Sequence, residues 1–109
     1  MSDDEFLDGL TDTLHEIETL IALGRTEYDA NRLLRWSVHR LWIFAGNSAQ
    51  VHAERHGIPC STWPWSDLIG FRGIIAHWTP AQVNDERVWD ETVRDLPEII
   101  EALGRPRRE

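Results

Sequence analysis

The sequence contains no lysine, only one cysteine and one tyrosine, and no long apolar run. The single Cys60 cannot form a disulfide within the chain, which favours a reducing compartment over secretion. No stretch approaches the roughly 20 apolar residues that a membrane-spanning helix needs. The N-terminus is acidic, the reverse of the basic region of a signal peptide. We therefore expect a cytoplasmic protein with no membrane segment.

Strand-type alternation, internal repeats and low-complexity tracts are also absent, whereas helical periodicity is present throughout. A chain of 109 residues is long enough for one modest core. Its hydrophobic content of 41% and six tryptophans supply that core. We predict an all-α fold, an up-and-down bundle of four to five helices over residues 1–104, with a loose tail at 105–109.

Apolar residues spaced three and four apart, bounded by glycine, proline and capping residues, predict four long helices. These helices cover residues 4–23, 29–56, 67–77 and 85–103. Ser66 is the expected N-cap of the third, Asn84 or Asp85 caps the fourth, and Pro97 kinks or restarts the fourth. The connections are expected to be loops at residues 25–28, 57–64 and 78–84. Trp63 and Trp65 should anchor the loop at 57–64, and Cys60 should pack within it.

Charge is unevenly distributed along the chain, which has a formal net charge of −8. Residues 1–22 carry seven acids and no arginine, whereas residues 29–57 carry four arginines against two acids. Within this basic segment Arg32, Arg35 and His39 are spaced to align along one edge of the second helix. Such an edge either guides RNA or is simply solvated. The opposite edge is the expected inner stripe: Leu34, Val38, Leu41, Ala45, Ser48 and His52.

His52 and His56 are four residues apart, a spacing that on a helix can hold a metal ion. Glu54 lies midway between them, so on a helix it points about 200° away from each. No other carboxylate is an obvious third ligand. We therefore predict no metal and no cofactor.

The segment from Pro64 to Trp78 is apolar except for a few residues, of which Arg72 and His77 carry its chemistry. On a helix these two side chains differ in direction by about 140° and in height by about 7.5 Å. Both can hold one phosphate only if the chain turns at His77 or if a second copy completes the site. Gly70, Gly73 and Ala76 form a smooth strip that predicts close packing with another helix, and we take the strip as a dimer interface.

The motif Arg72-x-x-x-x-His77 resembles that of the HEPN superfamily, and specifically its HepT-like branch of small bacterial ribonuclease toxins. The resemblance extends to the helix at 4–23, to the approach from Pro64 to Arg72, and to the closing helix with its proline. It also places Ala45-Gly46-Asn47-Ser48-Ala49 where the family has a glycine and an acid. The resemblance covers nearly the whole chain.

The resemblance implies a homodimer in which two copies of Arg72 and His77 line one cleft. It implies metal-independent RNA cleavage, in which the neighbouring 2′-hydroxyl attacks the phosphate. A histidine can move that proton near neutral pH, and an arginine can neutralise the phosphorane oxygens. Asn47 and Trp78 join the three edge residues of the second helix as candidate RNA-binding residues. The implied partner is a small nucleotidyltransferase antitoxin, as in a type VII-like toxin–antitoxin pair.

The chain departs from the family pattern at three positions. Gly73 replaces a polar residue after the arginine, Asn47 replaces the acid, and Thr79 replaces the tyrosine that the antitoxin modifies. Tyr28, the only tyrosine, is expected in another loop. The departures leave open a second interpretation, a non-catalytic helical module that docks a nucleotidyltransferase.

Overall fold

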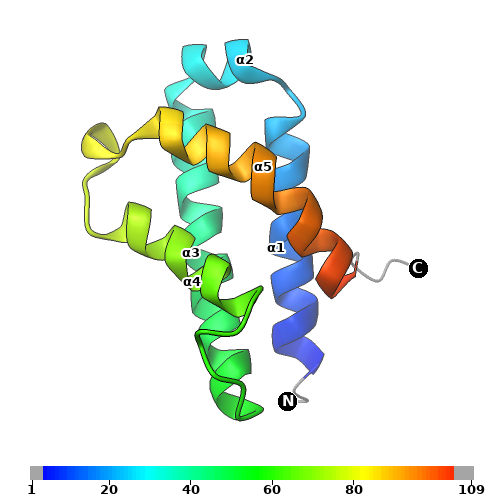
Figure 1. Cartoon of the computed structure of the whole chain (residues 1–109). Helices are drawn as coiled ribbons and strands as arrows, with labels where there is room; N and C mark the ends of the chain where they lie inside the picture. The colour runs from blue at the N-terminus through cyan, green and yellow to red at the C-terminus, as the bar shows by residue number, and fades with distance from the viewer. Residues whose placement is uncertain (1–3, 105–109) are drawn as a thin grey trace.

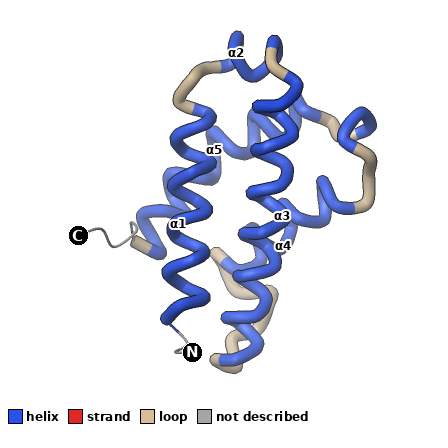
Figure 2. Tube along the Cα trace, turned by 180° about the vertical axis from the view of Figure 1, so that it is seen from behind, coloured by secondary structure: helices blue, strands red, loops and turns tan. Residues whose placement is uncertain are grey.

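The computed structural model describes residues 4–104, which form helices and short connections without a strand (Figures 1 and 2). The elements in order are α1 (Asp4–Ile21), α2 (Arg25–Ala30), α3 (Arg32–Arg55), α4 (Trp65–Ala76), a short 3₁₀ turn η1 (Pro80–Gln82) and α5 (Asp85–Leu103). The predicted all-α helical bundle is confirmed. The predicted tail at 105–109 lies outside the described residues. Among the described helices, none combines the length and the apolar character needed to cross a membrane.

Helix α3 is the centre of the arrangement (Figure 1). It runs antiparallel to α1, carries α2 at one end and packs against α4 along its lower half. Helix α5 lies obliquely across the bundle and also contacts α1 (Figure 2). Helix α4 therefore packs on α3 with one side, and its other side lies next to α5.

The core joins all four long helices through large side chains packed on small ones. Trp42 of α3 is fully buried, and its ring stacks on Phe71 of α4 with centroids 3.9 Å apart. The same indole donates a hydrogen bond of 3.0 Å to the hydroxyl of Thr92 on α5. Since a buried indole N–H needs a partner, this bond fixes α5 over the α3–α4 pair. Further buried core side chains are Leu10, Leu14, Ile17, Val38, Ala45, Ala49, Leu68, Val88, Leu96 and Ile99.

The predicted loop at 25–28 is wrong, because this segment begins the short helix α2. Tyr28 anchors α2 by burying its ring against Trp89 of α5, with centroids 5.1 Å apart. Helix α3 begins at Arg32 and not near residue 29. The reason is the side chain of Asn31, which accepts a hydrogen bond of 3.1 Å from the backbone N–H of Leu34 and so caps α3.

The start of α4 also differs from prediction. The helix begins at Trp65, and Pro64, not Ser66, occupies the N-cap position without a side-chain cap. Trp65 is buried and anchors the preceding loop as predicted, whereas Trp63 stays half exposed and only donates to Asp67 at 3.2 Å. Cys60 is exposed, so its predicted packing within the loop is wrong.

The inner stripe of α3 is broader than predicted, because α3 is covered on two sides. Leu34, Val38 and Ala45 are buried as expected, but Leu41, Ser48 and His52 are only half-buried. The additional buried positions of α3 are His39, Trp42, Gly46, Ala49 and Ala53. Asn84 caps α5 as predicted, by accepting from the N–H of Arg87 at 3.1 Å. Helix α5 continues through the exposed Pro97 to Leu103.

Candidate functional site

Arg72 lies where α4 crosses α3, directly against Gly46. A Cβ atom placed on Gly46 of α3 would lie 2.6 Å from the Cβ of Arg72 and 3.0 Å from the backbone oxygen of Leu68. Real side chains do not tolerate such distances, so only glycine permits this crossing. Gly46 in the interior of α3 lowers helix propensity by about 1 kcal/mol relative to alanine, and the close crossing explains its presence.

The guanidinium of Arg72 is oriented by the residue that follows this glycine. Its Nη1 atom donates a hydrogen bond of 2.9 Å to Oδ1 of Asn47. An amide orients the guanidinium without neutralising it, as a carboxylate would. Arg72 forms no ion pair with any carboxylate in the described part of the chain. Most of its five N–H donors therefore remain available to an anionic ligand.

His77 occupies the C-cap of α4 and is exposed. Its imidazole makes no hydrogen bond or ion pair with a side chain in residues 4–104. The nine-residue step from buried Leu68 to His77 corresponds to about 180° on a helix, so His77 points away from the core. Gly70 and Gly73 lie on the same outward side and are exposed.

The backbone at His77 remains helical, with φ −85° and ψ −3°. Two residues later, at Thr79, the backbone is extended, with ψ 155°. The separation of about 140° between Arg72 and His77 therefore persists. Of the two arrangements by which both residues reach one phosphate, a turn of the chain at His77 is not the one observed.

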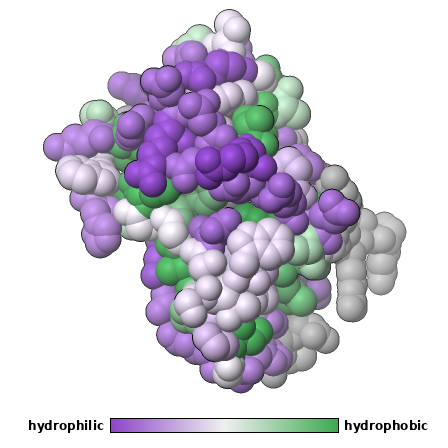
Figure 3. Space-filling view, in the orientation of Figure 1, coloured by the Kyte–Doolittle hydropathy of each residue, from purple (hydrophilic) through white to green (hydrophobic). Residues whose placement is uncertain are grey.

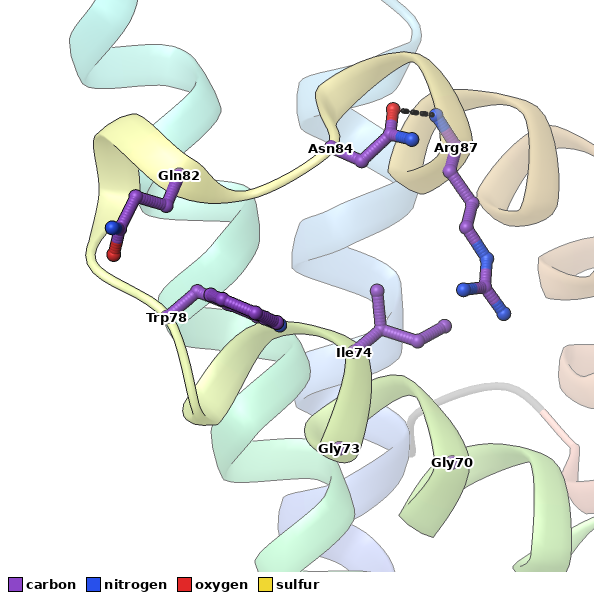
Figure 4. A pocket seen from close by; sticks show the side chains of 7 residues that line it. All are labelled: Gly70, Gly73, Ile74, Trp78, Gln82, Asn84 and Arg87. Carbon is purple, nitrogen blue, oxygen red and sulfur yellow. Dashed lines mark hydrogen bonds between the residues drawn. The ribbon is translucent and has the colours of Figure 1, made fainter.

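The predicted glycine strip is open in the single chain. A Cβ atom at Gly70 or Gly73 would have no heavy atom within 4 Å, and Ala76 is exposed. Beside the strip lies a hollow of ≈ 460 Å³ between α4 and α5 (Figure 4). Ile74 and Trp78 project into it from the α4 side, and Arg87 reaches down from α5 (Figure 4). We call this hollow, with its floor of Gly70 and Gly73, the glycine groove.

The glycine groove continues along α5. A second hollow of ≈ 270 Å³ shares Gly70, Ile74 and Arg87 with the first and adds Glu91 and Arg94. Figure 3 shows that the two sides of the groove differ in hydropathy. Strongly hydrophilic side chains cover α5, whereas the region of α4 and its preceding loop is paler and less polar. The groove thus has a charged wall and a smooth, weakly polar floor.

The three residues of the predicted arginine edge of α3, Arg32, Arg35 and His39, differ in their exposure. His39 is only 4% exposed, so its expected place on a solvent-facing edge is wrong. Its Nε2 lies 2.6 Å from Oδ1 of Asp85, and Arg35 contacts the same carboxylate at 3.6 Å. Arg35 also donates to the backbone oxygens of Tyr28 and Asp29. His39 and Arg35 thus hold α2, α3 and α5 together, while Arg32 remains exposed, with its guanidinium over the ring of Trp36.

This buried cluster also determines the state of the only tyrosine. Tyr28 is 1% exposed, and its hydroxyl donates to Asp85 at 2.7 Å. Burial, together with the bond to the carboxylate, raises the pKa of Tyr28 well above its ordinary value. Thr79, at the position where the resemblance places the modified tyrosine, donates its hydroxyl to Gln82 at 2.9 Å.

We expect Tyr28 to stay protonated in the folded protein at pH values where a free tyrosine, with a pKa of about 10, ionises. Because the folded-state pKa is raised, the stability that Tyr28 contributes is fully present below about pH 10 and decreases as the pH rises further. Tyrosinate absorbance reports on this residue alone, since the chain has one tyrosine. Absorbance that rises near pH 10, with far-UV circular dichroism unchanged, would contradict the buried hydrogen bond.

The two remaining candidate RNA-binding residues, Asn47 and Trp78, lie beside Arg72 and His77. Trp78 is 57% exposed and adjoins His77, and Asn47 is exposed beside Arg72.

His52 and His56, the candidate metal ligands, pack their rings 4.3 Å apart. No group of three His, Cys, Asp or Glu side chains within residues 4–104 is arranged to hold a metal ion.

Comparison with known proteins assigns the chain to a family. A family model described as "Ribonuclease HepT-like" matches residues 10–105, which is most of the chain. The protein belongs to the HepT-like ribonuclease family. No curated protein and no solved structure gives a significant match.

The match to the HepT-like family includes all of α3, α4 and α5, and therefore Asn47, Arg72 and His77. Membership supports a ribonuclease-type function for this HepT-like chain. The resemblance noted in the sequence is confirmed at the level of the family.

Proposed function

We propose that this protein is an RNA endonuclease that needs no metal and cleaves by attack of the 2′-hydroxyl on the neighbouring phosphate. Arg72 and His77 are the proposed catalytic residues. The observation that carries the proposal is the state of Arg72, whose charge is held in place by a neutral amide and left uncompensated by the described carboxylates. An oriented, unpaired guanidinium is suited to the charge that develops on a phosphorane.

In this mechanism His77 takes the proton from the attacking 2′-hydroxyl, and the leaving 5′-oxygen receives a proton from a histidine or from water. Its exposure and its lack of a partner among the described side chains leave the imidazole accessible to substrate. The oxygens of the phosphate are held by Arg72, which presents a planar fork that a lysine lacks. The products are a 2′,3′-cyclic phosphate and a 5′-hydroxyl.

The active form is proposed to be a homodimer joined through Gly70, Gly73 and Ala76. The support is twofold. Arg72 and His77 of one chain point in directions about 140° apart, and the glycine strip has no covering side chain within the described residues. A second α4 on the strip lets the arginine of one copy and the histidine of the other face one phosphate.

Replacing Gly73 with leucine is expected to weaken this dimer, because overpacking at a close helix contact typically costs about 1–3 kcal/mol. The fold of the single chain should be unaffected, since nothing lies within 4 Å of a Cβ at this position. Gly9→Leu is the matched control, because Gly9 is an exposed helical glycine of α1 that is equally open. Sedimentation velocity at matched concentrations provides the measurement. An unchanged dimer in Gly73→Leu would place the interface elsewhere.

The biological role proposed for this activity is that of a cytoplasmic toxin in a type VII-like toxin–antitoxin pair, with a nucleotidyltransferase as the antitoxin. The buried Tyr28 cannot serve as the antitoxin's target, because its hydroxyl is inaccessible and bound to Asp85. Neutralisation by capping the cleft is therefore the form of inhibition that we propose.

A second candidate function is a non-catalytic module of the same fold that docks a nucleotidyltransferase. Gly73 and Thr79 at the family's motif positions favour it, because neither supplies the side chain that the family uses there. Purified protein incubated with RNA and a chelator distinguishes the two. Cleavage supports the endonuclease, whereas a stable complex with the nucleotidyltransferase and no cleavage under any condition supports the docking module.

A further inference from the structure

A third hollow shares Trp78 with the glycine groove and lies against α3. It measures ≈ 200 Å³ and is formed where α3 meets the end of α4 and the segment after η1. Trp36 and Trp78 stand on its two sides, and Ile43, Ile75 and Val83 supply apolar walls. Both tryptophans are substantially exposed, at 38% and 57%. We call this the tryptophan hollow.

The size and walls of the tryptophan hollow fit one flat ring. Sites for drug-sized ligands typically measure about 300–1,000 Å³, so this hollow is too small for a large ligand. His39 of α3 also lines it. An apolar slot of this size beside two exposed indoles matches one nucleobase.

The surface that leads to the hollow alternates arginine with aromatic side chains along α3. Arg32 lies over the ring of Trp36 at 5.0 Å, and Arg40 lies over the ring of Phe44 at 4.9 Å. These four residues follow one another at intervals of four, so they form one outward stripe, the arginine–aromatic stripe. Neither arginine forms an ion pair with a carboxylate in the described range, unlike Arg25, Arg35, Arg87 and Arg94.

The charge of this surface selects a polyanion as the ligand. Residues 32–53 contain no acid, although the chain as a whole carries a formal charge of −8. Aromatic faces for stacking, together with arginines for the backbone, are how proteins hold single-stranded nucleic acid. A protein partner would leave Arg32 and Arg40 to be neutralised by its own acids, whereas a phosphate backbone supplies that charge at every nucleotide.

The stripe ends at the proposed catalytic residues. Asn47, which orients Arg72, follows Phe44 by three residues on α3, and Trp78 of the tryptophan hollow adjoins His77. We infer that the arginine–aromatic stripe binds the backbone of single-stranded RNA and that the tryptophan hollow takes one base, stacked on Trp36, beside the scissile phosphate. This inference rests on the proposed function for the position of that phosphate.

The test measures binding separately from cleavage, with a short 2′-O-methyl oligoribonucleotide that lacks the attacking hydroxyl. Fluorescence anisotropy gives the Kd for wild type and for Trp36→Ala. Loss of one stacked base is worth about 1–3 kcal/mol, so we expect Trp36→Ala to weaken binding about 5- to 150-fold. Trp63→Ala is the matched control, because Trp63 is an exposed tryptophan outside the hollow, and its Kd should equal that of wild type.

A second pair of variants tests the stripe. Arg32→Gln combined with Arg40→Gln should reduce the slope of log Kd against log salt by about 0.7 for each lost phosphate contact. Arg25→Gln is the control, since Arg25 is exposed but paired with Asp29. An unchanged slope in the double variant, or an unchanged Kd in Trp36→Ala, would overturn the inference. So would a loss of the dimer in Trp36→Ala, because the face would then be a protein interface.

The outcomes also separate this inference from the proposed function. If wild type cleaves RNA and Trp36→Ala binds the oligonucleotide as tightly as wild type, the endonuclease stands and the base site is wrong. If wild type binds the oligonucleotide through Trp36 but cleaves no RNA, the base site stands and the catalytic assignment is wrong.

Discussion

Replacing His77 with glutamine is expected to lower the rate of RNA cleavage about 10²- to 10⁴-fold across the whole pH range, the loss typical of a missing general acid or base. Glutamine keeps the approximate size and a hydrogen-bonding group but cannot titrate. The melting temperature should not change, because the imidazole is exposed and contacts no described side chain through a hydrogen bond or ion pair. Initial cleavage rates and thermal unfolding are measured on the same preparation.

His15→Gln is the control for this variant, since His15 is a half-buried histidine of α1 that lies outside α4. It should cleave at the wild-type rate. A His77→Gln protein that cleaves normally but melts at a lower temperature would show that His77 is a structural residue at the end of α4. His77 would then leave the catalytic assignment.

Replacing Arg72 should produce the second large effect. Arg72→Ala removes the charge and is expected to reduce cleavage about 10²- to 10³-fold, the typical loss for one oxyanion-stabilising group. Arg72→Lys keeps a positive charge but loses the fork that spans Asn47 and the phosphate, so its activity should lie between those of Arg72→Ala and wild type. The pH profile of Arg72→Lys should keep the wild-type shape, because Arg72 does not move the proton.

Arg25→Lys is the matched control, because it alters an exposed arginine that is paired with Asp29. An altered pH profile in Arg72→Lys would mean that Arg72 takes part in proton transfer. A wild-type rate in Arg72→Ala would remove the guanidinium from the site altogether. Either result would contradict a role for Arg72 in charge stabilisation alone.

Local signals in the sequence predicted the long helices, because each signal acts over one or two turns. Apolar spacing identified α1, and Asn84 and Gly104 marked the two ends of α5. The short helix α2 was missed for the opposite reason. A six-residue helix is not stable alone, and α2 depends on Tyr28, whose hydroxyl partner Asp85 lies 57 residues away.

The candidate site was likewise predictable only where it depends on residues that are close together in the sequence. Arg72 and His77 lie on one helix, so their relative direction followed from the sequence. The burial of His39 did not, because its partner Asp85 is 46 residues distant and a histidine beside two arginines has the pattern of a surface edge. Trp36 and Arg40 were overlooked as well. Their spacing of four was readable in the sequence, but the tryptophan hollow requires the end of α4 to lie beside them.

The proposed cleavage reaction is tested most directly by the chemical structure of the RNA ends formed in the presence of EDTA. Attack by the 2′-hydroxyl needs no metal and leaves a 2′,3′-cyclic phosphate on one product and a 5′-hydroxyl on the other. We expect these ends from wild type, no cleavage of an RNA carrying a 2′-deoxynucleotide at the cut site, and product formation by His77→Gln that is slower by about 10²- to 10⁴-fold. Cleavage that stops when EDTA is added, or products with a 5′-phosphate and a 3′-hydroxyl, would contradict a mechanism that depends on Arg72 and His77.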